Sequence, residues 1–451
     1  MRVTAAFSRL LGLKGVWVRK VLFKPDRVVV EVALCRRRLH CPLCDYSTKV
    51  RKDTRPVDSV WRHLDLGVWR LEVRCRRRRL WCPEHGARAE GVPFARLGSK
   101  FTRDFECLVA WLATKTDQTT IKRLVRIDWN TVGRIVGRVC DSELDPDRLQ
   151  RLFDIGIDEV SWRKQHSYLT LVVDHRRGKV VWGTKGAGEK AADEFFAELD
   201  PELGADPPQR KPADIQPGSP ESADPQPTAE DPQPRIAERA GKLEAISLDM
   251  GPGYAKSARR HAPQAVICID PYHVVQAANK ALDEVRRAYW NELRQLGDQA
   301  AAKRFKDARW SLLKAPKNLT DKQAATLRRL KAAGGEVWRG YTLKEAARGI
   351  FEHGLTLQDV TALIDRLLSR LARSRLKPFI RLGKTIRKHR DGILAAIRLG
   401  ITQGRTEALN NKVRLITRRA YGFHSAKAAL ALVMLTCGPI TLHLPHELHA
   451  P

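Results

Sequence analysis

The sequence contains no run of about 18 to 20 apolar residues, the length that a helix needs to cross a membrane. Its N-terminus has neither the apolar h-region nor the cleavage site of a secretory signal peptide. These two absences argue against an integral membrane protein and against a secreted one. We therefore expect a cytoplasmic protein.

Cysteine is also scarce, with nine residues in a chain of 451. An odd number of cysteines spread over a long chain does not suit a disulfide framework. Only two groups have the spacing of metal ligands: a CxxC pair, Cys41 and Cys44, and a CxxH pair, Cys82 and His85. Two such pairs on separate loops can supply four ligands in the tetrahedral arrangement that suits Zn²⁺. We expect a structural zinc site rather than buried free thiols. Its ligands are Cys41, Cys44, Cys82 and His85, with Cys75 and then Cys35 as substitutes.

Acidic residues are few beside the basic ones. There are 51 Asp and Glu against 82 Lys and Arg, which gives a net charge of +31 and a pI near 10.2. An extended polyanion, DNA or RNA, is the natural partner of such a chain. Composition alone leaves other basic proteins open, such as a ribosome-associated or membrane-surface protein.

Composition and periodicity divide the chain into segments. Short β-rich runs with cysteine come first, and an apolar period of 3.6 residues then indicates helices. An acidic stretch at 200–236 holds ten of the 24 prolines and is expected to be a disordered loop. The predicted boundaries are 1–100 for a small metal-stapled module, 101–150 for a helical region, 151–280 for the first part of an α/β core, 281–400 for an all-helical insertion and 401–451 for the final helices.

A change of period marks the α/β core. Phe153, Ile155 and Ile157 alternate as in a strand, and residues 168–173 and 179–182 form a predicted hairpin. A helix at 189–199 follows. Residues 245–249, 254–261 and 265–270 then predict the strand, helix and strand that build a parallel sheet.

Two short helices are predicted within 117–140. Thr119-Thr120 can cap the first, and a turn through Arg126-Ile127-Asp128 leads to the second. Such pairs also occur in proteins that do not bind DNA, but the net charge and the metal module favour a helix-turn-helix. Opposite an apolar stripe, the second helix presents the candidate base contacts of a recognition helix: Asn130, Thr131, Arg134 and Arg138.

Acidic residues after the core strands are candidates for two-metal phosphoryl transfer, in which carboxylates converge on a pair of Mg²⁺ ions. Asp158 ends the first strand and Asp249 the fourth, while Asp270, after the fifth, is the rival of Asp249. Periodicity alone favours a surface helix for the segment that follows Thr406. One face of that helix carries Glu407, Asn411, Arg414 and Arg418, a carboxylate in line with phosphate-binding groups.

A set of motifs spread over nearly the whole chain resembles insertion-sequence transposases of the ISL-three family. The motifs are Gly156-Ile157-Asp158-Glu159, Trp162-Arg163-Lys164, Tyr168-Leu169-Thr170, Asp249-Met250, Asp270-Pro271-Tyr272-His273, Arg309-Trp310, Thr406-Glu407-Ala408-Leu409-Asn410-Asn411 and Arg418-Arg419-Ala420-Tyr421-Gly422-Phe423-His424. The resemblance implies a multidomain α+β protein. It would have a small zinc-binding β-rich module, a helix-turn-helix, and a ribonuclease-H-like α/β catalytic core with an all-α insertion.

The resemblance also implies residue roles. The family's Asp, Asp, Glu triad falls on Asp158, Asp249 and Glu407, which would hold two Mg²⁺ ions, or Mn²⁺ in their place. Its DxxH signature falls on Asp270 and His273, where we favour a structural role for the histidine over a catalytic one. Trp310 either stacks on a distorted base or packs in a core.

The implied activity is that of a DNA transposase. Such an enzyme binds the terminal inverted repeats of its element, hydrolyses a strand at each end and joins the freed 3′-hydroxyl to target DNA. We expect a homodimer or larger synaptic assembly on double-stranded DNA, associated with the nucleoid and not with a membrane. The alternatives are a non-enzymatic DNA-binding protein derived from a transposase and a ribonuclease-H-like DNA nuclease.

Overall fold

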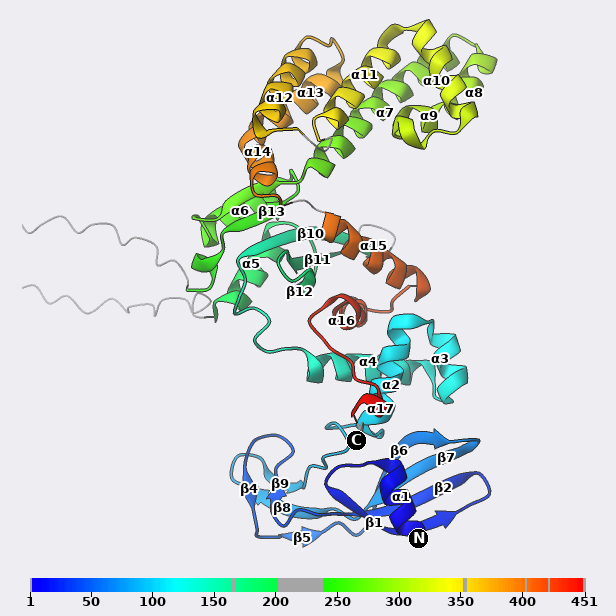
Figure 1. Ribbon diagram of the computed structural model, residues 1–451, viewed down its shortest axis with the longest axis vertical. Coiled ribbons are helices and arrows are strands. Elements are labelled where there is room, and N and C mark those ends of the chain that lie inside the picture. Colours follow the sequence, from blue (N-terminus) through cyan, green and yellow to red (C-terminus); the bar gives the residue numbers. More distant parts are fainter. Residues whose placement is uncertain are drawn as a thin grey trace, which may run out of the picture. The chain divides into compact units, whose positions relative to one another are not determined.

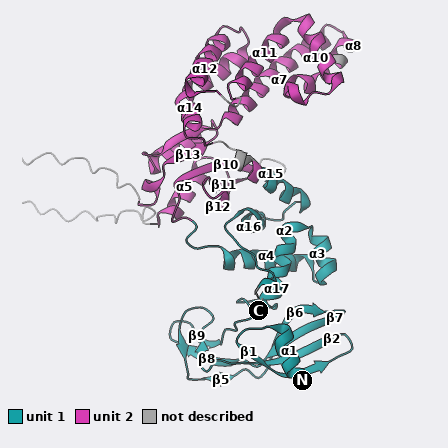
Figure 2. Ribbon diagram, in the orientation of Figure 1, with its two compact units in different colours: residues 1–148, 161–167, 411–451 teal, residues 149–160, 168–410 magenta. Residues whose placement is uncertain are grey.

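The computed structural model describes residues 2–163, 167–201, 238–351, 355–401, 404–420 and 422–448, without the side chains at 304, 307 and 404–407. The chain forms two compact units, one of residues 1–148, 161–167 and 411–451 and the other of residues 149–160 and 168–410 (Figure 2). Within the described ranges, no helix is both long enough and apolar enough to cross a membrane.

The first unit starts with a helix, α1 (Val3–Leu11), on a four-stranded sheet (Figure 1). The strands are β1 (Val16–Phe23), β2 (Arg27–Leu34), β6 (Ser59–Leu66) and β7 (Trp69–Cys75), in the order β1-β2-β7-β6 with β2 and β7 parallel. Because side chains alternate along a strand, Val28, Val30, Leu71 and Val73 share one face and form a core with Phe7 of α1. The β-rich runs were predicted, but α1 was not.

Two small sheets carry the predicted metal ligands. One pairs β3 (Leu39–His40) with β4 (Ser47–Thr48), and the other joins β5 (Asp53–Thr54), β8 (Arg78–Cys82) and β9 (Gly86–Ala89). Leu39 and Leu80 are buried with Cys41 and Cys82 in a core of their own. Four buried side chains are too few to hold these short strands by burial alone, so a metal ion is the expected staple.

Helices make up the rest of this unit. They are α2 (Arg103–Lys115), α3 (Gln118–Val125), α4 (Trp129–Glu143), α16 (Ala426–Cys437) and α17 (Pro445–Leu448). The α3–α4 pair agrees with the predicted helix-turn-helix, and Arg126 makes the turn in the left-handed region, at φ 56°. The predicted cap at Thr119-Thr120 is wrong, because Asp117 caps α3 by accepting from the Thr120 backbone N–H, and Asp128 caps α4 in the same way.

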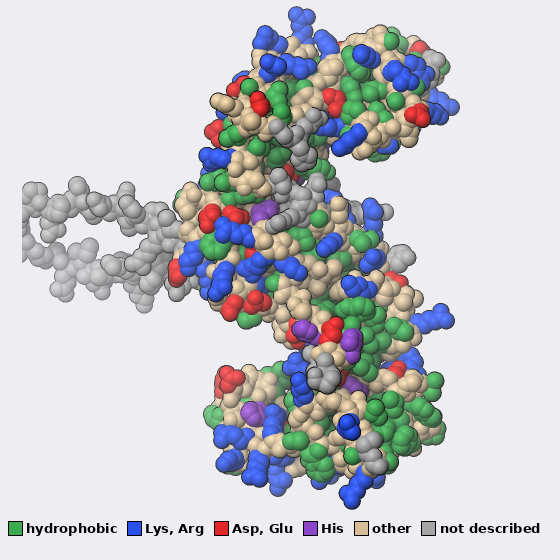
Figure 3. Space-filling view, in the orientation of Figure 1, with side chains coloured by type: hydrophobic (Ala, Val, Ile, Leu, Met, Phe, Trp, Pro, Cys, Tyr) green, Lys and Arg blue, Asp and Glu red, His purple; other side chains and the backbone are tan. Residues whose placement is uncertain are grey.

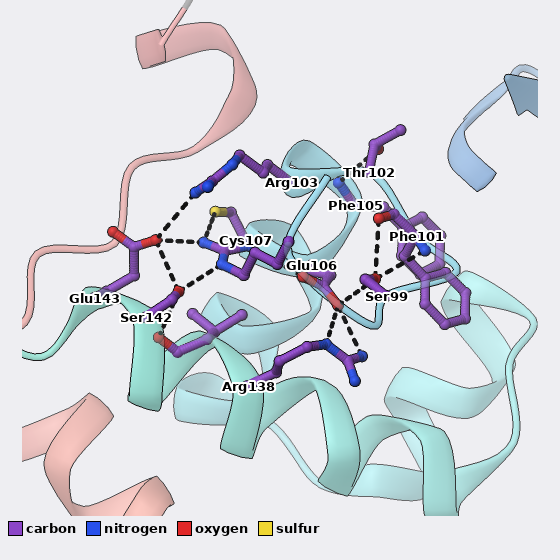
Figure 4. Close-up of polar contacts among 12 residues, drawn as sticks. Ser99, Phe101, Thr102, Arg103, Phe105, Glu106, Cys107, Arg138, Ser142 and Glu143 are labelled. Atoms are coloured by element: carbon purple, nitrogen blue, oxygen red, sulfur yellow. Dashed lines mark hydrogen bonds and ion pairs between the residues drawn. The ribbon is translucent and has the colours of Figure 1, made fainter. Parts of the chain in front are cut away.

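A buried carboxylate joins α4 to α2 (Figure 4). Glu106 of α2 is fully buried and accepts hydrogen bonds from Arg138 Nε at 2.8 Å, Ser99 Oγ at 2.7 Å and Arg96 Nη1 at 3.2 Å. Removing a partner of such a buried charge costs about 3–5 kcal/mol. The network therefore fixes the orientation of α4.

The second unit contains a five-stranded sheet in the order β12-β11-β10-β13-β14. The strands are β10 (Asp154–Arg163), β11 (Ser167–Asp174), β12 (Lys179–Lys185), β13 (Ala245–Leu248) and β14 (Val266–Ile269). The backbone N–H of His175 donates to the carbonyl of Asp154, so β10 and β11 run antiparallel, as do β11 and β12, whereas β10, β13 and β14 are parallel. Among the helices that share its core are α5 (Glu189–Leu199) and α6 (Pro252–His261).

Helices follow the fifth strand, as predicted. They are α7 (Pro271–Gln295), α8 (Gln299–Asp307), α9 (Arg309–Leu313), α10 (Asp321–Ala333), α11 (Gly335–Gly349), α12 (Leu357–Ala372), α13 (Lys377–Lys388), α14 (Arg390–Arg398) and α15 (Gly404–Arg419). A Cβ at Gly392 would lie 2.8 Å from Ile269 Cγ1, so glycine lets α14 approach the edge strand β14 closely.

The predicted disordered loop at 200–236 lies, apart from its first two residues, outside the described residues. The chain on its two sides is held together by Asp200. Its carboxylate accepts from the backbone N–H groups of Arg239 at 3.1 Å and Ala240 at 2.8 Å. The length of the intervening segment therefore does not change the position of β13.

Candidate functional site

Asp158 and Asp249 lie on adjacent parallel strands. The register pairs Gly156 of β10 with Ser247 of β13. Asp158 and Asp249 each lie two residues further along the chain, so the two aspartates are neighbours. A hydrogen bond of 2.7 Å between His175 Nε2 and Ser247 Oγ lies directly over Gly156, where any Cβ would collide with both groups. The sheet therefore places Asp158 beside Asp249, which directly follows β13. The prediction that Asp158 ends the first strand is wrong, because β10 continues to Arg163.

Asp270 follows the next strand out. Leu248 of β13 pairs with Ile269 of β14, so Asp270 is separated from Asp158 by the intervening strand. It caps α7 by accepting from the Tyr272 backbone N–H at 3.0 Å, and its side chain is almost fully buried. His273 Nε2 lies 4.0 Å from Asp270 Oδ2. These contacts place the DxxH pair at the start of α7.

Helix α15 is tied to the middle of β10. Asn410 Nδ2 donates to Asp158 Oδ2 at 2.5 Å, and Asn410 is 7% exposed. Residue 407 lies on the same helix three residues earlier, about one turn from Asn410. The side chain of Glu407 lies outside the described residues. Leu409, Val413 and Ile416 of α15 are buried.

Glu159 is a further carboxylate at this site that sequence reasoning missed. Tyr254 of α6 donates a hydrogen bond of 2.9 Å to Glu159 Oε1, and Thr170 Oγ1 lies 2.9 Å from the tyrosine oxygen. Burial raises the pKa of Glu159, and the charges of Asp249 and Asp158 raise it further. The charges of Asp158 and Asp249 therefore both disfavour the ionised form of Glu159. The adjacency of Glu159 to Asp158 was the available signal.

Basic groups line a groove of about 720 Å³ beside β14. Arg259, Lys388 and Arg398 contribute positive charge, and His389 lies at the junction of α13 and α14. Burial, together with Lys388 and Arg259, lowers the pKa of His389, while Asp249 acts in the opposite direction. Asp391 also lines the groove, so three basic side chains stand against one carboxylate there. The excess of positive charge can attract a phosphate.

The predicted metal ligands of the first unit converge. Cys41, Cys44, Cys82 and His85 place one ligand atom each within 4.8 Å of all the others. Cys44 Sγ lies 3.6 Å from Cys82 Sγ, and Cys82 Sγ lies 3.6 Å from His85 Nδ1. Ligands in a zinc tetrahedron are separated by about 3.5–3.8 Å, so these four side chains can hold a metal ion. The substitutes are excluded, since Cys75 is in the core of the larger sheet and Cys35 is exposed.

Helix α4, the second of the helix-turn-helix, exposes some of the residues that were predicted to contact DNA. Asn130 and Arg134 are exposed, and Arg134 Nη2 donates to Thr131 Oγ1 at 3.0 Å. Arg138, expected to face outward, is instead ion-paired to the buried Glu106. The periodicity of α4 alone does not show this partner, because α2 supplies it. Trp129, not predicted, is 48% exposed at the first position of the helix.

The remaining candidates lie on exposed helix surfaces. Asn411, Arg414 and Arg418 are exposed on α15, where Arg414 Nη1 donates to Asn411 Oδ1 at 3.2 Å. Trp310 of α9 is 55% exposed, with the Arg309 guanidinium 5.1 Å from its ring centre. That exposure removes the alternative of a core tryptophan.

Comparisons with known proteins agree on one family. A family model described as "Transposase" matches residues 155–206 and 231–432, and a second, described as "Helix-turn-helix domain of transposase family ISL3", matches residues 90–140. The chain is 35% identical over 467 residues to the transposase for insertion sequence element IS1557 of Mycobacterium tuberculosis, covering 97% of this chain and 96% of that protein. It is 26% identical over 365 residues to the transposase for insertion sequence element IS1001 of Bordetella parapertussis, covering 80% of each.

Proposed function

This chain belongs to the transposase family ISL3, and we propose that it binds the terminal inverted repeats of an insertion sequence, cuts a strand at each end and joins the freed ends to target DNA. One observation carries the catalytic part of the proposal. Asp158 lies in the middle of β10, Asp249 directly follows the adjacent parallel strand β13, and Asn410 connects Asp158 to the helix that carries Glu407.

The strand order supports a ribonuclease-H-like core. Three consecutive strands, β10, β11 and β12, form antiparallel neighbours, and β13 and β14 extend the sheet in parallel beyond β10. The first carboxylate then belongs to the central strand, the second to the strand beside it, and the third to a helix after an all-helical insertion. This is the arrangement that the family resemblance implies for Asp158, Asp249 and Glu407.

The donor set suits Mg²⁺, which prefers carboxylate oxygen to sulfur or imidazole. Asp158, Asp249 and Glu407 would hold two ions, with Mn²⁺ as a substitute, and such a pair activates the attacking oxygen and stabilises the leaving oxygen. Asn410 fixes the orientation of the Asp158 carboxylate, and Tyr254 does the same for Glu159. The protein thereby fixes the positions of the ligands in advance, which favours in-line displacement at phosphorus.

Binding of the DNA ends is assigned to the helix-turn-helix. Asn130, Thr131 and Arg134 are the proposed base contacts at the start of α4, whereas the Glu106 pair makes Arg138 a structural residue. Three residues of α15 and one of α9 are proposed to bind DNA near the cleavage site: Asn411, Arg414, Arg418 and Trp310.

The cluster of three cysteines and one histidine is proposed to bind structural Zn²⁺. Thiolate and imidazole ligands with this spacing suit zinc and not Mg²⁺. Because two transposon ends must react together, the working form is proposed to be a homodimer or larger assembly on double-stranded DNA.

One assay separates this function from its rivals. The purified protein is incubated with duplexes that carry its flanking inverted repeats, a target plasmid and Mg²⁺, and the products are separated on a gel. Joined products support a transposase. Specific binding without cleavage would identify a non-enzymatic DNA-binding protein, and cleavage without joining would identify a nuclease.

A further inference from the structure

The β6–β7 hairpin exposes apolar side chains at its tip. Leu66 pairs with Trp69, and Gly67 and Val68 form the turn between them, with Gly67 at φ +63°. Val68 is 80% exposed, and Leu66 and Trp69 are each 39% exposed. Hairpin turns usually carry polar residues, because their side chains lie in water. An apolar tip therefore suggests a surface that another molecule covers.

The same hairpin is fixed to the turn of the helix-turn-helix. Arg126, the turn residue, donates from Nε to Asp65 Oδ2 at 3.1 Å and from Nη1 to the Val68 carbonyl at 3.1 Å. In the other direction, Arg62 of β6 donates to the carbonyl oxygens of Val125 at 3.0 Å and Arg126 at 3.1 Å. The hairpin and the turn thus exchange hydrogen bonds both ways, and both belong to the first unit (Figure 1).

These bonds place the hairpin tip beside the start of the recognition helix. Helix α4 begins three residues after Arg126, and its first residues, Trp129 and Asn130, are exposed. A recognition helix presents its N-terminal residues to the major groove. A tip held against the turn just before that helix therefore meets the DNA that flanks the same groove.

Charge favours DNA over a second copy of this chain as the partner. Residues 1–100 contain 24 Lys and Arg against 9 Asp and Glu, a net charge of +15 out of +31 for the whole chain. Arg70 next to the tip is exposed, as are Lys122 and Arg123 on α3, while Asp65 is paired with arginine. Such a surface repels its own copy and attracts phosphates. Lys and Arg also gather over the small sheets of the same unit (Figure 3).

We propose that the β6–β7 hairpin is a wing of the helix-turn-helix, supplied by the metal-stapled module that precedes it in the chain. Val68 and Trp69 enter the groove next to the one that α4 reads, and Arg70 contacts a phosphate. Apolar side chains are used in this way by proteins that widen or kink the minor groove. The inference rests on the proposed function, since it assumes that α4 binds the terminal repeats.

The test compares two valine substitutions in the full-length protein. Val68→Asp places a negative charge at the tip, and Val50→Asp places one at a 75% exposed valine between β4 and β5. Binding to terminal-repeat duplexes is measured by titration, and the contacts are mapped by hydroxyl-radical footprinting. We expect Val68→Asp to bind about tenfold more weakly and to lose protection beside the α4 footprint, with Val50→Asp like wild type.

Equal binding and equal footprints for Val68→Asp and wild type would overturn the wing. An equal loss of DNA affinity in Val50→Asp would also overturn it, because the added negative charge alone would then explain the effect. A Val68→Asp protein that loses its dimer by light scattering but keeps its footprint would make the tip a protein interface instead. If wild type protects no repeat, the proposed function fails, and the comparison is made on a random duplex. There the wing still predicts weaker binding by Val68→Asp than by Val50→Asp.

Discussion

Asn410 donates a hydrogen bond of 2.5 Å to Asp158, although 252 residues separate the two in the chain. The bond joins the helix of Glu407 to the strand of Asp158. It restrains the Asp158 carboxylate together with the Glu159 backbone N–H, which donates to Asp158 Oδ1 at 2.7 Å. Partners of this kind orient metal ligands, and losing one costs roughly 10–100-fold in activity or metal affinity.

We therefore expect Asn410→Ala to lower the Mg²⁺-dependent nicking rate by about 10–100-fold while leaving the affinity for terminal repeats unchanged. The rate is measured at saturating DNA. Asn291→Ala, at an exposed asparagine of α7, is the matched control. An unaltered nicking rate in Asn410→Ala would remove Asn410 from the catalytic site.

A pair of matched substitutions tests which of Asp249 and Asp270 is the metal ligand. Asp249→Asn should abolish detectable nicking, because an amide cannot replace a carboxylate as a ligand of Mg²⁺. Asp270→Asn should keep nicking and change the melting temperature little, because asparagine caps a helix nearly as well as aspartate. The opposite pattern, with Asp270→Asn inactive and Asp249→Asn active, would exchange their roles.

Zinc binding is tested by substituting one cysteine inside the proposed zinc cluster and one cysteine outside it. We expect one zinc per chain by elemental analysis of the wild type, and a loss of that zinc with a lower melting temperature in Cys82→Ser. Cys75→Ser should keep its zinc, because Cys75 packs in the neighbouring apolar core. Loss of zinc in Cys75→Ser, with retention in Cys82→Ser, would refute the ligand set.

Lys344 predicts a pH dependence of stability within the helical insertion. Burial lowers the pKa of Lys344 from its ordinary 10.5 to about 8, although its ammonium donates to the Leu312 carbonyl at 2.8 Å. Between pH 8 and 10.5 the unfolded chain binds more protons at this residue than the folded chain, so the stability of the folded state rises with pH. Below pH 8 both states are protonated and the effect is constant.

The measurement is the melting temperature of wild type relative to Lys344→Met across that range. The difference should move in favour of wild type as the pH rises from 8 to 10, since methionine does not titrate. A difference that stays flat, or that moves toward the variant, would contradict a lowered pKa for Lys344.

The sequence predicted elements whose signals are local. The helix at 189–199 matches α5 residue for residue, and the strands near 245 and 265 agree within two residues, because apolar periodicity and flanking turns mark them. The cysteine and histidine pairs could also be read directly, since zinc ligands come in fixed local spacings.

Features that depend on distant partners could not be predicted. The outward-facing pattern of α4 includes Arg138, but only the folded chain shows the buried Glu106 that pairs with it. Likewise, nothing near Glu159 in sequence indicates Tyr254, and nothing near Arg126 indicates Asp65. Tertiary contacts decide these roles, and the apolar periodicity of a helix or a strand gives no information about such contacts.

The central claim is that Asp158 is a metal ligand of a cutting and joining site, and one substitution tests it most directly. Asp158→Asn removes the charge, keeps the side-chain size and leaves the helix-turn-helix unchanged. The protein is titrated with terminal-repeat DNA and then assayed for Mg²⁺-dependent nicking of the same DNA. We predict that Asp158→Asn binds the repeats as wild type does and produces no nick. Nicking at the wild-type rate would contradict the account.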